Sequence, residues 1–468
     1  MKAILLILVL LVIAAPIALF VSSQPAAVMV EPVKVIGIET PVHVQVNSPH
    51  GVRRVEVDVV QDGKSYTAAK VEKPSKRLLI DRHVAPTSLT ATAGRRSIPA
   101  LHDGKAQIVV TAVANDMQGA STTKTLNVDV MTAPPTVSAD GAQHYINQGG
   151  SEMVTFTPGG AWTEAGVKVG DYTFRSFPLP GHPGQYFSLF AFFWQLPPDT
   201  PVYVYATNPS GAMARSDFWH KVFPKQFHSS TIKLESMNLD RIVNQIDPNH
   251  KIPGDLVQRF VYINSTMRKA NNKTLSDLRF QTEPKFLWTG AFLPMVDSTV
   301  EARFADQRTY TWQGKTVDQQ VHLGFDLAKV AHSPIPASND GRVVWAENLG
   351  IYGNCVVIDH GFGLQSIYGH LSEFLVKKGD MVKKGQIIGK TGSTGLAGGD
   401  HLHFTMQVDG VQVNSVEWWD PHWVKDRVLS QMGLTLQGGD AATAAASEHR
   451  PTERRAKAKV APKRKRRR

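Results

Sequence analysis

The sequence is almost without cysteine. Cys355 is the only one among 468 residues, so an intramolecular disulfide framework is excluded. Val356, Val357 and Ile358 follow it and predict a buried strand, so we interpret Cys355 as a small core residue. Glycine (37) and proline (28) are plentiful, and this composition favours many short strands joined by turns over long helices.

Acidic residues are scarce at the C-terminal end, and this scarcity accounts for most of the net charge of +11. Residues 450–468 contain 11 Lys/Arg and one Glu, so this segment carries +10 and the rest of the chain only +1. Runs of like charge are usually disordered, and we predict a disordered basic tail over 437–468. Anionic wall polymers or lipids are its expected partners if it is not purely solvated. No nucleic-acid partner is expected, because the N-terminal segment favours export.

A long apolar run follows Met1 and Lys2. The 19 residues from Ala3 to Val21 are apolar and are interrupted only by Pro16. As a helix of about 1.5 Å per residue, they would span roughly 28 Å, close to the ~30 Å hydrocarbon core of a membrane. We predict a signal anchor over 1–24, with a cleaved signal peptide as the alternative. In either case the bulk of the chain lies outside the cytoplasm.

Alternating valines predict a β-rich N-terminal half. Valine occupies every second position in residues 42–46 and 55–59, which is typical of strands with one buried face. Together with later short apolar runs, this pattern predicts an immunoglobulin-like β-sandwich over 28–133. A second strand-rich segment, 136–225, predicts another module of this kind. We interpret both modules as spacers or interaction surfaces that position a functional domain.

Residues 226–285 have a different character. Asp255 is a favourable N-cap residue, and the apolar residues after it recur at helical spacing, namely Leu256, Phe260, Ile263 and Met267. We therefore predict a mixed linker region with one helix that packs one face onto a neighbouring element.

Three short histidine motifs lie in the C-terminal third, over 286–425. They are His322-Leu323-Gly324-Phe325-Asp326, Tyr368-Gly369-His370-Leu371 and His401-Leu402-His403-Phe404. Zinc prefers imidazole nitrogen and carboxylate oxygen, and a catalytic zinc site keeps one position for water. His322, Asp326 and His403 supply three ligands of this type. Side chains two apart on a strand share a face, so His401 and His403 can share one cleft, one facing the metal and the other the substrate.

The order of these motifs resembles the lysostaphin/LytM-type zinc metallopeptidases, which cut peptide cross-links in bacterial peptidoglycan. Between the histidine motifs the shared pattern also includes residues 339–343, Asp359-His360-Gly361 and residues 379–386. The resemblance covers about 100 residues. It implies an antiparallel β domain with an open groove and one Zn²⁺, acting on peptidoglycan stem peptides.

The same resemblance assigns roles to five residues. It implies that His322, Asp326 and His403 are the metal ligands, and that His370 and His401 are the two catalytic histidines beside the metal. Which of these two is the general base stays open. Among the other histidines, we interpret His360 as structural, while His332 and His422 lie outside the motifs.

We therefore expect a zinc metalloendopeptidase that hydrolyses peptide cross-links of peptidoglycan outside the cytoplasm. The expected location is the bacterial inner membrane, with a single span and the bulk of the chain in the periplasm or wall space, or secretion after cleavage. A non-catalytic LytM-like regulator of other wall hydrolases is one alternative. A lipoyl or biotin carrier is another, because the hairpin at 379–386 is shared with those folds, but the Met-Lys-Met turn of a biotin carrier is absent.

Overall fold

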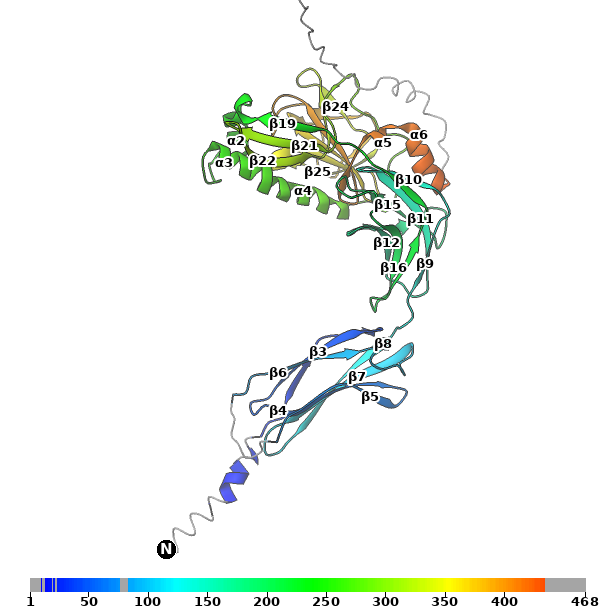
Figure 1. Cartoon of the computed structure of the whole chain (residues 1–468), viewed down its shortest axis with the longest axis vertical. Helices are drawn as coiled ribbons and strands as arrows, with labels where there is room; N and C mark the ends of the chain where they lie inside the picture. Colours follow the sequence, from blue (N-terminus) through cyan, green and yellow to red (C-terminus); the bar gives the residue numbers. More distant parts are fainter. Residues whose placement is uncertain (1–9, 11–12, 19, 22, 76–82, 434–468) are drawn as a thin grey trace, which may run out of the picture. The chain divides into compact units, whose positions relative to one another are not determined.

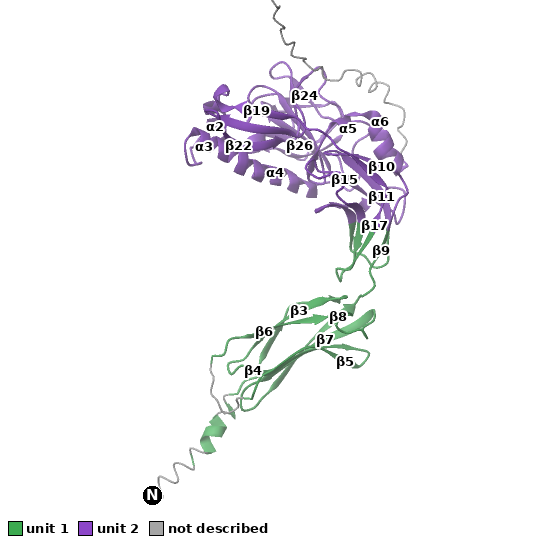
Figure 2. Ribbon diagram, in the orientation of Figure 1, with its two compact units in different colours: residues 1–137, 158–165, 205–215 green, residues 138–157, 166–204, 216–468 purple. Residues whose placement is uncertain are grey.

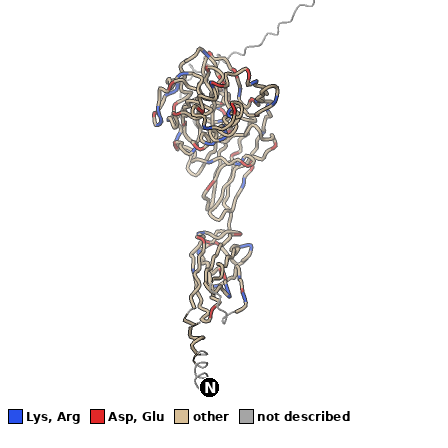
Figure 3. Tube along the Cα trace, turned by 90° about the vertical axis from the view of Figure 1, so that its left-hand side faces the viewer, with Lys and Arg blue, Asp and Glu red and all other residues tan. Residues whose placement is uncertain are grey.

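The computed structural model describes residues 10, 13–18, 20–21, 23–75 and 83–433 (Figure 1). The protein is mainly β, as predicted. It forms two compact units, which Figure 2 shows in different colours. Unit 1 comprises residues 1–137, 158–165 and 205–215, and unit 2 comprises 138–157, 166–204 and 216–468. Acidic and basic residues are interspersed along the described chain (Figure 3), in line with the low net charge outside the tail.

The predicted anchor over 1–24 falls largely on residues outside the described part of the chain. Among the residues that are described, no helix combines the length and the apolar character that a membrane span requires. The anchor and its alternative, a cleaved signal peptide, stay predictions. The basic tail over 437–468 lies wholly outside the described residues and also stays a prediction.

Unit 1 contains a β-sandwich of two sheets. The smaller sheet has the order β1-β3-β6, with bounds Ala27–Val30, Thr40–Asn47 and Thr87–Ala93. The larger sheet has the order β2-β8-β7-β4-β5, with bounds Val35–Ile36, Ser121–Val130, Gly104–Ala114, Val52–Gln61 and Lys64–Glu72. The alternating valines of β3 and β4 are buried in one core, because every second side chain of a strand faces the same side.

The segment predicted as a second module, 136–225, forms three small sheets. Strands β10 (His144–Asn147) and β18 (His220–Phe223) pair in parallel. The order β14-β15-β11-β9 has the bounds Phe177–Pro178, Tyr186–Ala191, Ser151–Gly159 and Thr136–Ala139. The order β13-β12-β16-β17 has the bounds Tyr172–Arg175, Glu164–Val169, Val202–Thr207 and Met213–Asp217.

Polar contacts inside unit 2 tie this segment to the C-terminal domain. Arg175 donates from its backbone nitrogen to Asp409 Oδ2 at 2.8 Å and from Nε to Oδ1 at 2.7 Å. The buried Glu417 accepts from Asn147 Nδ2 and from the backbone nitrogen of Ser151, both at 2.8 Å. The sequence analysis did not predict this connection.

The C-terminal domain is built on one large sheet. Its order is β20-β23-β31-β27-β26-β25-β29, with β32 paired to β31. The bounds, in that order, are Thr299–Ala302, Phe325–Ala328, Leu402–Val408, Leu364–Leu371, Asn354–Asp359, Gly341–Asn348, Met381–Val382 and Val411–Val413. All neighbouring strands in it are antiparallel, as predicted. Cys355 is buried in its core, also as predicted.

Two smaller sheets complete this domain. One has the order β24-β30-β28, with bounds Pro334–Pro336, Ile387–Lys390 and Glu373–Phe374. The other has the order β19-β21-β22, with bounds Ser229–Lys233, Asp306–Trp312 and Lys315–His322. Strand β19 runs parallel to β21, so the segment predicted as a linker adds a strand to the domain.

Helices cover the β19-β21-β22 sheet (Figure 1). Helix α3 (Leu256–Tyr262) begins with the predicted cap, a capping box between Asp255 and Gln258. It continues through a π-helical turn, Ile263–Met267, into α4 (Arg268–Asp277). Helix α2 (Leu239–Ile246) was not predicted, because eight residues with three buried side chains make a short pattern. Phe260 and Ile263 pack with Tyr310 of β21 in one core.

Candidate metal centre and groove

Strand pairing in the C-terminal domain brings the histidine motifs together. Strand β22 ends at His322, and β23 follows after two residues and contains Asp326. Strand β31 contains His403, which is the direct antiparallel partner of Asp326 and also pairs with Gly369, next to His370. Residues more than 70 positions apart in the sequence therefore meet at one point of the sheet.

Three donor atoms lie close together at this point. His322 Nε2 is 2.9 Å from Asp326 Oδ1 and 3.0 Å from His403 Nδ1. The third side of the triangle, from His403 Nδ1 to Asp326 Oδ1, is 3.2 Å. All three residues are buried, and among the described residues they form the group with the composition and spacing to hold a metal ion.

This donor set fits zinc. A tetrahedral ion bonded at about 2.0–2.1 Å separates its ligand atoms by about 3.3 Å, a few tenths of an ångström more than the sides of the triangle. His322 Nδ1 lies 3.2 Å from the backbone oxygen of Arg303. Because a carbonyl only accepts, Nδ1 carries the proton and Nε2 is left as a lone pair for a cation.

The ring of His403 is held against two glycines. A Cβ atom on Gly324 would lie 2.5 Å from His403 Cε1 and 2.7 Å from Nε2, and one on Gly369 would lie 3.3 Å from His403 Cβ. His403 Nε2 is buried and has no hydrogen-bond partner among the described residues. The glycine of the His-x-Gly-x-Asp motif is therefore required by the position of the histidine ring.

His370 and His401 flank the triad. Their ring centroids are 4.9 Å apart, and the His370 ring is 5.8 Å from that of His403. His370 Nδ1 donates to the oxygen of Thr394 at 2.8 Å, and His401 Nδ1 donates to that of Gly399 at 3.0 Å. In each neutral ring Nδ1 therefore carries the proton, and Nε2 carries one only when the imidazole is protonated.

The backbone of His370 has a φ of +67°, which is in the left-handed region. A residue with a side chain occupies this region at a cost of about 1–3 kcal/mol, and such residues cluster at functional sites. The conformation places the ring beside His401 and His403 at the end of β27.

The two flanking histidines differ electrostatically. Burial holds the pKa of His370 well below its usual value, and the neighbouring His401 and His403 act in the same direction. Burial also lowers the pKa of His401, but the hydrogen bond to Asp326 and the charge of that carboxylate outweigh burial and raise it. His401 Nε2 lies 3.5 Å from Asp326 Oδ1. Paired groups with separated pKa values suit opposite roles in proton transfer.

A guanidinium group binds the second oxygen of the candidate ligand Asp326. Arg308 Nη2 is 3.0 Å from Asp326 Oδ2. Arg308 lies on β21 and also donates from Nε to Asp306 Oδ2 at 3.2 Å. Neither residue was predicted, since no motif marks them and only the β19-β21-β22 sheet brings them to the site.

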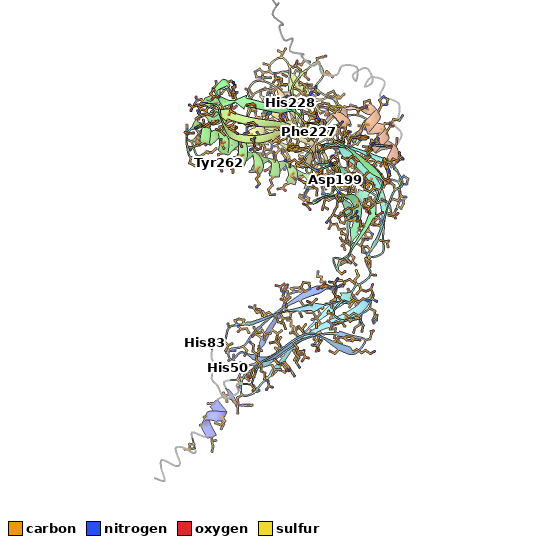
Figure 4. All side chains as sticks on the ribbon, in the orientation of Figure 1. His50, His83, Asp199, Phe227, His228 and Tyr262 are labelled. Carbon is orange, nitrogen blue, oxygen red and sulfur yellow. The ribbon has the colours of Figure 1, made fainter. Side chains whose placement is uncertain are left out.

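The site opens into a groove of about 900 Å³. All five predicted site residues line it. Its other wall includes residues that precede the histidine motifs, among them His228, Ser230, Phe260, Arg268, Arg308 and Tyr310. His228, labelled in Figure 4, stands directly before β19. The open groove therefore has one wall from the motif-bearing strands, and the other comes partly from the segment predicted as a linker, 226–285, and partly from β21.

The remaining predicted histidines lie elsewhere. His360 is buried, with Nδ1 bound to the oxygen of Asp340 at 2.7 Å and Nε2 to Ser366 Oγ at 2.8 Å, which supports its interpretation as structural. His332 is exposed beside Ser372 and Asp400. Neither His332 nor His422 lines the groove.

The motif-bearing part of the chain is similar to known peptidases. Residues 320–415 match the model of peptidase family M23. The DD-carboxypeptidase/endopeptidase Mpg of Neisseria meningitidis serogroup B is 38% identical over 107 residues, 23% of this chain and 23% of that protein. The peptidoglycan DD-endopeptidase ShyA of Vibrio cholerae is 45% identical over 96 residues, 20% of this chain and 22% of that protein. The chain thus spans less than a quarter of the length of these relatives.

A solved structure is similar to part of the chain. It is a point mutant of the catalytic domain of the prophage-encoded M23 protein EnpA from Enterococcus faecalis. The identity is 31%, and the alignment covers 27% of this chain and 95% of that one, with a TM-score of 0.23.

Proposed function

Because the C-terminal part of the chain, with residues 320–415, belongs to peptidase family M23, we propose that the protein is a zinc metalloendopeptidase that hydrolyses peptide cross-links of bacterial peptidoglycan. The observation that carries this proposal is the triangle of His322, Asp326 and His403 with two further histidines beside it, all lining one groove. The names of the relatives, a DD-carboxypeptidase/endopeptidase and a peptidoglycan DD-endopeptidase, support peptidoglycan as the substrate.

His322 Nε2, Asp326 Oδ1 and His403 Nδ1 would hold the ion. Bound zinc supplies a Lewis acid that polarises the scissile carbonyl and lowers the pKa of water towards neutral. His370 and His401 keep Nε2 free for the groove, because a backbone carbonyl binds each Nδ1. One of them accepts the proton of the attacking water and passes it to the leaving amine. The other, when protonated at both ring nitrogens, would donate a hydrogen bond from Nε2 to the oxygen that becomes negative.

We further propose that the protein acts outside the cytoplasm. The apolar run from Ala3 to Val21 supports either a single-pass anchor in the inner membrane or a signal peptide removed on secretion. In both arrangements the peptidase domain faces the periplasm or wall space, where peptidoglycan lies.

The test is hydrolysis of isolated cell walls by the purified full-length protein loaded with zinc. We expect soluble peptide products, identified by mass, from the wild type and none from His401→Ala. The product masses identify the bond that is cut. A wild type that binds zinc stoichiometrically and releases no peptide from several wall types would overturn the proposal and favour the alternative, a non-catalytic regulator of other wall hydrolases.

A further inference from the structure

The two carboxylate oxygens of Asp326 have different surroundings. Oδ1 lies 2.9 Å from His322 Nε2 and 3.2 Å from His403 Nδ1, so it faces the candidate metal position. Oδ2 points away from the histidines and accepts from Arg308 Nη2 at 3.0 Å. A carboxylate with one oxygen bound by a guanidinium keeps a single orientation, because rotation about its terminal bond would break that contact.

Arg308 is itself fixed. Its Nε donates to Asp306 Oδ2 at 3.2 Å, and its side chain is 19% exposed. Asp306 is 7% exposed and is also bound by His228 Nδ1, directly before β19, at 2.8 Å and by Ser230 Oγ of β19 at 2.9 Å. The guanidinium is therefore held between two carboxylates, Asp306 on β21 of the β19-β21-β22 sheet and Asp326 on β23 of the large sheet. Burial lowers the pKa of Arg308, but Asp326 and Asp306 contribute to a net rise, and the group stays charged at any working pH.

We propose that Arg308 is a positioning residue of the metal centre, which orients Asp326 so that Oδ1 alone faces the ion, and that Asp306 holds Arg308 in place for this purpose. The inference rests on the proposed metal site and is independent of the proposed substrate. Side chains that bind and orient a metal ligand typically account for about 10–100-fold in metal affinity.

The geometry requires arginine at this position. The guanidinium presents Nε to Asp306 and Nη2 to Asp326 from one rigid plane. A lysine ammonium is a single point of charge on a flexible stem and cannot reproduce this fork. Arg308→Lys therefore keeps the charge but loses the orientation of Asp326, whereas Arg308→Gln loses both.

The test measures metal binding by the full-length protein and its variants. Zinc affinity is obtained by competition with a chromophoric chelator, and ligand geometry from the visible absorption of the Co²⁺-substituted protein. We expect Arg308→Gln to weaken zinc binding by about 10–100-fold and to alter the cobalt spectrum. Arg308→Lys should fall between wild type and Arg308→Gln, and Asp306→Asn should shift both readouts in the same direction.

Arg268→Gln is the matched control. Arg268 lines the same groove, but its Nε and Nη2 bind the backbone and side-chain oxygens of Asn264 and not the candidate ligand. Arg268→Gln removes one positive charge from the groove, as Arg308→Gln does, and should leave zinc affinity and the cobalt spectrum unchanged. Equal weakening by Arg268→Gln and Arg308→Gln would show a general charge effect and overturn the inference.

Wild-type zinc affinity and an unchanged cobalt spectrum in Arg308→Gln would also overturn it. Thermal unfolding of the metal-free variants shows which of them fold, and if Arg308→Gln does not, Arg308→Lys and Asp306→Asn decide the question by the same readouts. Peptide release from cell walls is measured separately. Its absence in a zinc-binding wild type would contradict the proposed function and leave the role of Arg308 standing.

Discussion

Asp326 and His403 are direct partners in the antiparallel pairing of β23 with β31, and this pairing places Asp326 Oδ1 3.2 Å from His403 Nδ1. A one-residue slip of β23 against β31 would turn Asp326 to the face of the sheet opposite His403. The candidate metal centre therefore depends on the same backbone hydrogen bonds that hold the large sheet together.

His403→Ala should abolish stoichiometric zinc binding, because it removes one of three donors and leaves His322 and Asp326 too few to hold the ion tightly. The zinc content of the purified protein, measured by elemental analysis, checks this. His332→Ala, at an exposed histidine that does not line the groove, should retain the metal. A His403→Ala protein with one tightly bound zinc would refute the ligand assignment.

His401→Ala should keep zinc and lose activity. The ring is beside the triad but contributes no atom to it, and its Nδ1 is bound to Gly399. Loss of a general acid or base typically lowers the rate by about 10²–10⁴-fold. Zinc content and peptide release are measured on the same preparation. Loss of the metal together with activity would instead place His401 among the ligands.

Gly324→Ala should weaken zinc binding although it adds only a methyl group. The new Cβ would lie 2.5 Å from His403 Cε1, so the histidine ring has to move. Overpacking of this kind typically lowers the free energy of unfolding by about 1–3 kcal/mol. Denaturant unfolding and zinc affinity check both effects. Gly141→Ala is the control, because a Cβ there meets nothing within 4 Å, and similar losses in the two variants would refute the explanation.

Glu417 should make the protein less stable as the pH rises from about 4.5 to 7. Burial raises the pKa of its carboxyl from 4.5 to about 7, in spite of the hydrogen bonds from Asn147 and Ser151. Because the folded pKa lies above the unfolded one, this carboxyl stabilises the fold fully below about pH 4.5, and the contribution is lost as the pH rises through about 7.

The neutral variant Glu417→Gln should lose this pH dependence. Between pH 5 and pH 8 the free energy of unfolding of the wild type should therefore fall by about 1–3 kcal/mol more than that of the variant. Denaturant unfolding at both pH values measures the difference. Glu152, whose pKa burial raises to about 8, contributes in the same direction, and because the charge of Glu417 also raises that pKa, the variant loses this part of the pH dependence too. Equal pH slopes would show that Glu417 stays charged when folded.

The candidate metal centre could be predicted because its residues lie in short sequence motifs. His322 and Asp326 lie on either side of one turn between strands, and His403 follows His401 by two residues at the start of β31. The order of the motifs distinguishes them from chance pairs. The alternating valines of unit 1 likewise report buried strand faces directly.

Contacts between distant segments could not be predicted. Arg308 has no motif around it, and its place beside Asp326 follows only from the pairing of β21 with β22. The bonds of Arg175 to Asp409 and of Ser151 to Glu417 join residues 234 and 266 positions apart. Side chains of this kind are indistinguishable in the sequence from ordinary surface charges, because nothing local fixes their partners.

The wall contributed by β19 and β21 has a practical consequence for excision and transplantation of the peptidase. A fragment cut to the family match, residues 320–415, would keep His322, Asp326 and His403 but omit Arg308, Asp306 and one side of the groove. Grafting residues 320–415 into another chain would transfer the three candidate ligands without the residues that orient them. A fragment that keeps both walls of the groove therefore begins at or before His228.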